Sequence, residues 1–137
     1  METSHVTYLG GLRTEATHIR SGNKITTDAP PDNQGRGEYF SPTDILATSL
    51  ATCMITIIGI AAQTHGFNID GTTANVTKIM GTEPRRVIEV VIVLELPNNN
   101  YSEKERKIIE HSVKNCPVAK SLHPDLKQNV TIKYREA

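Results

Sequence analysis

The stretch SPTDILATSLATCMITIIGIAAQTHG, residues 41–66, decides the fold of this chain of 137 residues. Ser41 can cap a helix, and Pro42 suits the first helical position, where its missing N–H costs no hydrogen bond. Asp44 lies in the first turn, where the helix dipole favours a negative charge. The sequence therefore predicts one long helix that runs from Pro42 to about His65.

Residues 45–63 of this helix carry no charge, and a segment of that length can span a bilayer. Several Thr and Ser residues and Gln63 dilute its hydrophobicity, however, and neither a Lys/Arg cluster nor an aromatic belt flanks it. We therefore expect a helix that protein covers on nearly all sides. A chain this short can hardly build that cover alone, so a second copy is expected to supply part of it.

Short strands and two further helices are predicted around the long helix. The strands are bounded by Gly, Pro and Asn turns, and the second helix opens with a capping-box pattern at Ser102. The predicted strands lie at residues 6–17 (two, with a turn at Gly10-Gly11), 24–27, 68–80, 86–96 and 130–134, and the further helices begin after Ser102 and at Pro117. This order predicts a single α+β domain over residues 1–137, in which an antiparallel sheet wraps the central helix.

The composition excludes several classes of function. Lys and Arg total 15 and Asp and Glu total 15, which leaves no basic surplus for a nucleic-acid binder. The first residues show neither a secretory signal nor an Arg-rich targeting pattern. We expect a cytoplasmic protein that binds neither nucleic acid nor a membrane.

The two cysteines are the side chains best suited to chemistry. Cys53, in the middle of the long helix, is by itself more typical of a small core residue. Cys116 can cap the helix that Pro117 opens, where the helix dipole favours a thiolate, or it can be an ordinary residue at a helix end. Taken together, the two thiols suit a cycle in which one attacks an oxidant and the other resolves the sulfenic acid as a disulfide.

Other chemistries find less support in the sequence. The histidines form no HxH or HxxxH group and the cysteines no CxxC group, so we expect neither a metal nor a cofactor. A cysteine hydrolase with His111 or His123 as its base stays open, although the sequence assigns no residue that would orient the base. The glycines at residues 35–37 are a weak signal for phosphate binding.

A cation near a buried thiol is the remaining requirement for reactivity. Burial among aliphatic side chains favours the neutral thiol, and an adjacent guanidinium restores the thiolate. The candidates are Arg13 and Arg20 in the first group of strands and Arg36 in the loop at residues 28–39.

Two motifs together resemble the OsmC/Ohr family of thiol peroxidases. They are SPTD at residues 41–44 with Cys53 after it, and NCPV at residues 115–118 with Ser121-Leu122 after it. The resemblance covers nearly the whole chain in element order. It implies an intertwined homodimer in which two long central helices lie between the sheets.

The resemblance also implies an activity, the reduction of organic hydroperoxides to alcohols. Cys53 would attack the peroxide, Cys116 would resolve the product, and a dithiol such as a lipoyl group would regenerate both thiols. The dipole of the helix after Pro117 favours Cys116 as the readier thiolate, and we follow the resemblance in the order of roles. The competing hypothesis is a non-enzymatic dimer that binds a small hydrophobic ligand.

The resemblance assigns the cation as well. In the family an arginine of the first strands activates the attacking thiol, and Arg13 is the best match, with Arg20 in reserve. Thr43 stands where the hydroperoxide-resistance branch carries an acidic residue that orients the arginine. Glu38 is the candidate substitute.

Overall fold

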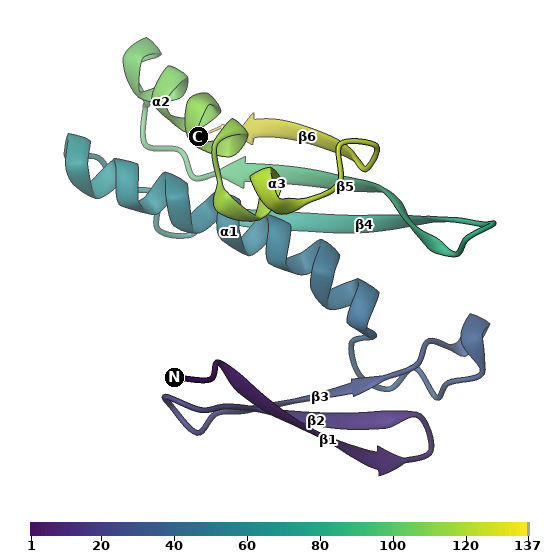
Figure 1. The fold of residues 1–137 in the computed structure, drawn as a ribbon. Coiled ribbons are helices and arrows are strands. Elements are labelled where there is room, and N and C mark those ends of the chain that lie inside the picture. Colours follow the sequence, from purple (N-terminus) through teal and green to yellow (C-terminus); the bar gives the residue numbers. More distant parts are fainter. Residues whose placement is uncertain (137) are drawn as a thin grey trace. The chain divides into compact units, whose positions relative to one another are not determined.

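The structure, a computed structural model, describes residues 1–136 and confirms the α+β class. Three strands precede the long helix, and the other strands and helices follow it in the predicted order (Figure 1). The elements are β1 (Ser4–Gly10), β2 (Arg13–His18), β3 (Lys24–Asp28), the 3-10 turn η1 (Pro31–Asn33), α1 (Pro42–His65), β4 (Thr73–Gly81), β5 (Arg86–Leu96), α2 (Glu103–Lys114), α3 (Pro117–Ser121) and β6 (Lys127–Tyr134).

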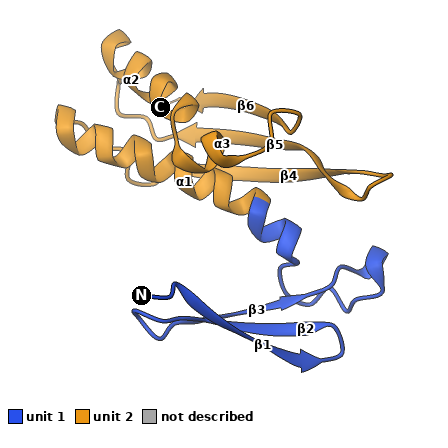
Figure 2. Cartoon of the chain, viewed as in Figure 1, with its two compact units in different colours: residues 1–46 blue, residues 47–137 orange. Residues whose placement is uncertain are grey.

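The chain forms two compact units, residues 1–46 and residues 47–137 (Figure 2). The first unit holds the antiparallel sheet β1-β2-β3, the loop after it and the first turn of α1. The second unit holds the rest of α1, the sheet β4-β5-β6 and the two shorter helices.

In the first unit, the turn after β2 sets the register of the β2–β3 hairpin. Thr17 lies opposite Lys24 at the turn end of the hairpin, and Arg13 lies opposite Asp28 at the other end. Side chains of directly opposite residues lie on the same face of a sheet. The hairpin therefore places a guanidinium beside a carboxylate.

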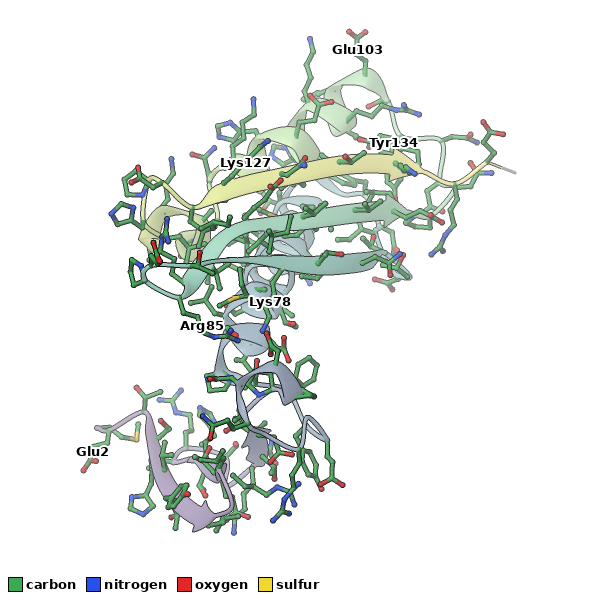
Figure 3. The ribbon with its side chains drawn as sticks, turned by 90° about the vertical axis from the view of Figure 1, so that its right-hand side faces the viewer. Glu2, Lys78, Arg85, Glu103, Lys127 and Tyr134 are labelled. Atoms are coloured by element: carbon green, nitrogen blue, oxygen red, sulfur yellow. The ribbon has the colours of Figure 1, made fainter. Side chains whose placement is uncertain are left out.

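The second sheet differs from the expected all-antiparallel arrangement at one pair of strands. β4 and β5 are antiparallel, as expected, but β6 runs parallel to β5. A parallel neighbour requires a crossover connection, and α2 and α3 provide it between β5 and β6. Lys127 and Tyr134 mark the two ends of this last strand (Figure 3).

The main core lies between α1, α2 and one face of the second sheet. Its buried apolar side chains include Ala47, Leu50, Met54 and Ile58 of α1, Val90, Ile92 and Leu94 of β5, and Ile109 and Val113 of α2. α1 is long and apolar enough to cross a membrane by length and composition, yet this face belongs to the protein core. On another part of α1, Ile60 is 54% exposed, so the single chain leaves the expected cover of this helix incomplete.

Candidate active site

The fold brings the two cysteines together within the second unit. Cys53 lies on α1 and Cys116 between α2 and α3, and the two thiols are near enough for that of Cys53 to affect the pKa of Cys116. Both are free thiols; Cys116 is fully buried and Cys53 is partly buried. A reagent therefore has better access to Cys53 than to Cys116.

Local structure at the joint between two helices fixes Cys116. α2 ends at Lys114, and Pro117 opens α3, so that Cys116 is the N-cap residue of the shorter helix. Its Sγ accepts a hydrogen bond of 3.3 Å from the backbone N–H of Ala119. This is the cap that the sequence predicted.

The electrostatics of Cys116 contradict the expectation that it is the readier thiolate. Burial raises the pKa of Cys116, and the neighbouring thiol of Cys53 raises it further. The N–H of Ala119 lowers the pKa, but by less than burial raises it. One helix of five residues supplies too little positive potential to offset the loss of water around a fully buried thiol.

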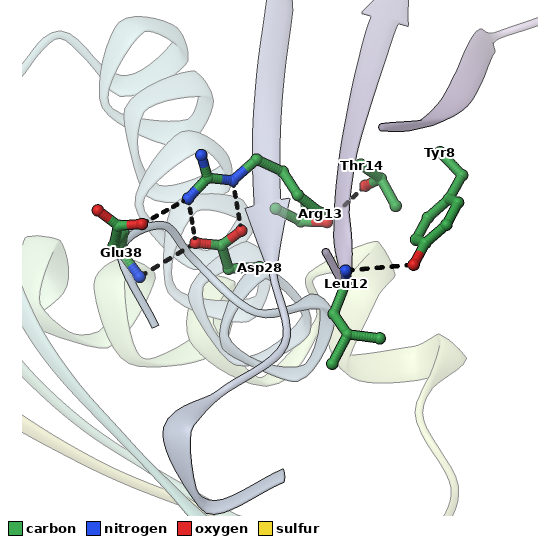
Figure 4. Close-up of polar contacts among 7 residues, drawn as sticks. Tyr8, Leu12, Arg13, Thr14, Asp28 and Glu38 are labelled. Carbon is green, nitrogen blue, oxygen red and sulfur yellow. Dashed lines mark hydrogen bonds and ion pairs between the residues drawn. The ribbon is translucent and has the colours of Figure 1, made fainter. Parts of the chain in front are cut away.

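A second polar cluster lies in the first unit, around Arg13 on β2 (Figure 4). Its Nε donates to Oδ1 of Asp28 at 2.7 Å, and its Nη2 donates to Oδ2 of Asp28 at 2.9 Å. Nη2 also donates to Oε1 of Glu38 at 2.8 Å. The side chain of Asp28 is 1% exposed, and that of Glu38 is 61% exposed.

The charges of this cluster stabilise one another. Hydrogen bonding to Arg13 holds the pKa of Asp28 below its usual value, although burial opposes the shift, and Arg36 contributes through its charge. The same contact with Asp28 is the main cause that raises the pKa of Arg13 above its usual value. The ring of Tyr39 lies against the guanidinium, 4.8 Å from its central carbon. Arg13 is therefore a permanently charged and firmly held cation.

The loop after β3 places Glu38 in this cluster. The N–H of Gly37 donates to the carbonyl of Ala29 at 3.2 Å, and the N–H of Gly35 donates to the carbonyl of Pro30 at 2.9 Å. Gly37 has a φ of +63°, which favours glycine, and a Cβ on Gly35 would lie 1.7 Å from the carbonyl oxygen of Ala29. These N–H groups bind the protein's own carbonyls, so the weak phosphate signal of this loop finds no support.

The other residues that the sequence singled out lie elsewhere. Arg20 is exposed near the turn after β2, and His111 contacts Asn115. His123 accepts a hydrogen bond from the N–H of Asp125. Within residues 1–136, no group of three or more His, Cys, Asp or Glu side chains could hold a metal ion.

Asp28 is the residue of the Arg13 cluster that was not predicted from the sequence. It looked like the first residue of a loop, whereas it is the last residue of β3. A signal for it exists, because a hairpin that turns around Ser21, Gly22 and Asn23 must bring position 28 opposite position 13. The hydroxyl of Thr43 interacts with the hydroxyl of Ser41 at 3.2 Å.

Comparison with known proteins gives consistent matches over most of the chain. The family model described as OsmC-like protein matches residues 35–132. A solved structure from Psychrobacter arcticus, described as an osmotic stress induced and detoxification response protein, is 57% identical, with a TM-score of 0.92 and 96% of each chain covered. No curated protein matches the chain.

More distant solved structures share the fold. An OsmC-like protein from Mycoplasma pneumoniae is 23% identical, with a TM-score of 0.80, and the match covers 97% of this chain and 96% of that chain. An organic hydroperoxide resistance protein from Legionella pneumophila is 13% identical, with a TM-score of 0.71, and the match covers 97% of this chain and 98% of that chain.

Proposed function

Since the chain belongs to the OsmC-like family, we propose that it has a role in redox stress and is a thiol peroxidase that reduces organic hydroperoxides to alcohols. The observation that carries the proposal is that the fold brings two free thiols near enough for that of Cys53 to affect the pKa of Cys116. Two neighbouring thiols can be joined as a disulfide once one of them is oxidised. The name of the Legionella relative, an organic hydroperoxide resistance protein, supports the substrate class.

The chemistry follows in three balanced steps. The thiolate of Cys53 attacks one oxygen of the hydroperoxide, the O–O bond breaks, and the departing alkoxide takes up a proton as the alcohol, which leaves Cys53 as a sulfenic acid. The thiol of Cys116 then attacks the sulfenic sulfur, which forms the disulfide and releases water. Finally, a dithiol such as a lipoyl group reduces the disulfide by exchange and is itself oxidised to a disulfide.

The division of roles between the thiols agrees with their surroundings. Cys53 is the more accessible thiol and suits attack on a substrate from solution. Cys116 is buried, and burial raises its pKa, which favours the neutral thiol and suits the resolving role. Arg13 is the cation proposed to stabilise the thiolate of Cys53, and Glu38 helps to hold Arg13.

One observation favours a second candidate, a non-enzymatic dimer that binds a small hydrophobic ligand. A cavity of about 340 Å³ opens in the second unit between α1, α2 and β6. Apolar side chains line most of it, namely Met54, Val113, Val130 and Ile132. A small apolar molecule would fit such a cavity.

A rate assay with tert-butyl hydroperoxide and a dithiol separates the two candidates. We expect the wild-type protein to consume peroxide far faster than its Cys53→Ser variant. Peroxide consumption equal to that of Cys53→Ser would refute the peroxidase and leave the binder.

Intact mass tests the disulfide step separately. One equivalent of hydroperoxide should lower the mass of the wild-type protein by two hydrogens, because the resolving thiol removes the sulfenic acid. Cys116→Ser should instead gain oxygen. An unchanged mass in both proteins would contradict the redox cycle.

A further inference from the structure

We propose that Asp28 positions Arg13 and leaves the Nη1 end of its guanidinium to face the reacting anion. This inference rests on the proposed function, in which Arg13 stabilises the thiolate of Cys53. It assigns Asp28 a role that the sequence analysis had given to Glu38 alone.

The first support is the geometry of the two contacts. Asp28 accepts two parallel hydrogen bonds from Nε and Nη2 of Arg13, at 2.7 and 2.9 Å, and such a pair fixes both the plane and the direction of a guanidinium. Glu38 accepts one bond from Nη2, which leaves the guanidinium free to rotate about it. The geometry of Arg13 therefore depends chiefly on Asp28.

The difference in burial between Asp28 and Glu38 supports the same conclusion. The side chain of Asp28 is 1% exposed, so its position is fixed by the surrounding protein. The side chain of Glu38 is 61% exposed, and ion pairs in contact with water contribute little. Oδ2 of Asp28 also accepts a hydrogen bond of 3.1 Å from the backbone N–H of Glu38. Asp28 thus holds in place the second partner of Arg13 as well.

A count of donors shows which end of Arg13 is left for a ligand. A guanidinium has five N–H donors, one on Nε and two on each Nη. Asp28 and Glu38 take the donors of Nε and Nη2, and within residues 1–136 no hydrogen bond of Nη1 is found. The ring of Tyr39 occupies one face of the group. Nη1 is therefore the donor group that Asp28 and Glu38 leave over for an anion, and Figure 4 draws no contact to it.

The charge of Asp28 makes the inference sharply testable. As a charge alone, Asp28 weakens the attraction between Arg13 and a thiolate, so its removal would favour the thiolate. As a positioning residue, Asp28 strengthens that attraction, so its removal would disfavour the thiolate. The two roles predict shifts of opposite sign.

The experiment measures the thiolate absorbance of Cys53 against pH in a Cys116→Ser background. We expect Asp28→Asn to move the curve to higher pH by about one unit, which is roughly a tenfold loss of thiolate on the acidic side of the curve. Arg13→Met should move it in the same direction. A shift of the Asp28→Asn curve to lower pH, or no shift, would overturn the inference. As a control, Glu15→Gln removes a carboxylate of β2 that pairs with Lys24 and not with Arg13, and it should leave the curve in place.

Two further variants test whether Asp28 acts through Arg13. If Asp28 acts only through Arg13, the double variant Asp28→Asn/Arg13→Met should titrate as Arg13→Met does, and additive shifts would contradict this. Should Asp28→Asn not fold, Arg13→Lys retains the charge without the paired hydrogen bonds, and an unmoved curve there would refute the need for orientation.

The outcomes also distinguish this inference from the proposed function. If Arg13→Met shifts the curve and Asp28→Asn does not, only the role of Asp28 is wrong. If Arg13→Met leaves the curve unmoved, the electrostatic role of Arg13 in the proposed function is wrong, and the inference about Asp28 is overturned with it.

Discussion

At the scale of single residues, the two thiols should differ in reactivity. Cys116 is buried and burial raises its pKa, whereas Cys53 is partly exposed. Iodoacetamide at mildly alkaline pH should therefore modify Cys53 first, because alkylation requires an accessible thiolate. Peptide mass spectrometry after short exposure measures the order. Faster modification of Cys116 in the folded protein, with equal rates in the denatured protein, would contradict the prediction.

The Arg13–Asp28 ion pair predicts a pH dependence of stability. The pKa of Asp28 is lower in the folded chain than its ordinary value of about 3.8, so the pair contributes stability above that pH and loses it as the pH falls further. Asp28→Asn should therefore be less stable than the wild type at neutral pH, and the difference should shrink at about pH 3. Urea unfolding at both pH values measures it. A difference that stays constant would show that the carboxylate charge contributes nothing.

Parts of the site could be predicted from the sequence at this scale, and parts could not. Cys53, Cys116, Arg13 and Glu38 were named, and the structure places them in two clusters. Asp28 was missed because β3 ends at Asp28, one residue later than the strand predicted from the sequence. The raised pKa of Cys116 could not be predicted, since it depends on burial by residues distant in the chain.

At the scale of elements, the long helix should depend on its first residues. Oγ of Ser41 accepts from the N–H of Asp44 at 3.1 Å, and Oδ2 of Asp44 accepts from the N–H of Ser41 at 2.9 Å. This is a reciprocal cap, and Ser41 is only 1% exposed. Ser41→Ala should reduce the free energy of unfolding by about 1–2 kcal/mol, since the half-buried N–H of Asp44 loses its partner.

The second helix provides a matched control. Ser102 and Glu105 form the same reciprocal pair at 3.1 and 2.9 Å, but in contact with water. Ser102→Ala should therefore cost less than Ser41→Ala, about 0.5–1 kcal/mol. Chemical denaturation of both variants measures the two values. Equal costs would mean that burial adds nothing to the cap of α1.

Elements whose boundaries depend on nearby residues agree with the predictions from the sequence. Elements whose arrangement depends on residues distant in the chain differ from those predictions. The starts of α1 and α2 follow from Ser and Pro patterns within a few residues. β4 begins at Thr73, later than expected, because a turn in which Thr72 donates to Ile69 precedes it. The parallel pairing of β6 depends on the path of the chain through α2 and α3, which no local pattern contains.

At the scale of the whole molecule, the first unit lacks an apolar core of its own. Among its described residues, the buried ones are polar: Thr27, Asp28 and Ser41. Large apolar side chains on two of its strands, β1 and β3, are more than half exposed, namely Val6 at 58%, Tyr8 at 64%, Leu9 at 53% and Ile25 at 55%. Three strands without a covered apolar face are only marginally stable. The unit therefore requires a covering surface, and we propose that a second copy of the chain supplies it.

This requirement predicts an obligate homodimer. Folding and association should then be one process, so that the unfolding midpoint rises with protein concentration. Ile60→Lys, which puts a charge on an exposed apolar position of α1, should weaken the dimer and lower the midpoint. Thr131→Lys, on an exposed position of β6, should do neither. Sedimentation and thermal unfolding measure both effects. A cooperatively folded monomer at micromolar concentration, with a midpoint independent of concentration, would show that one chain covers its own apolar surface.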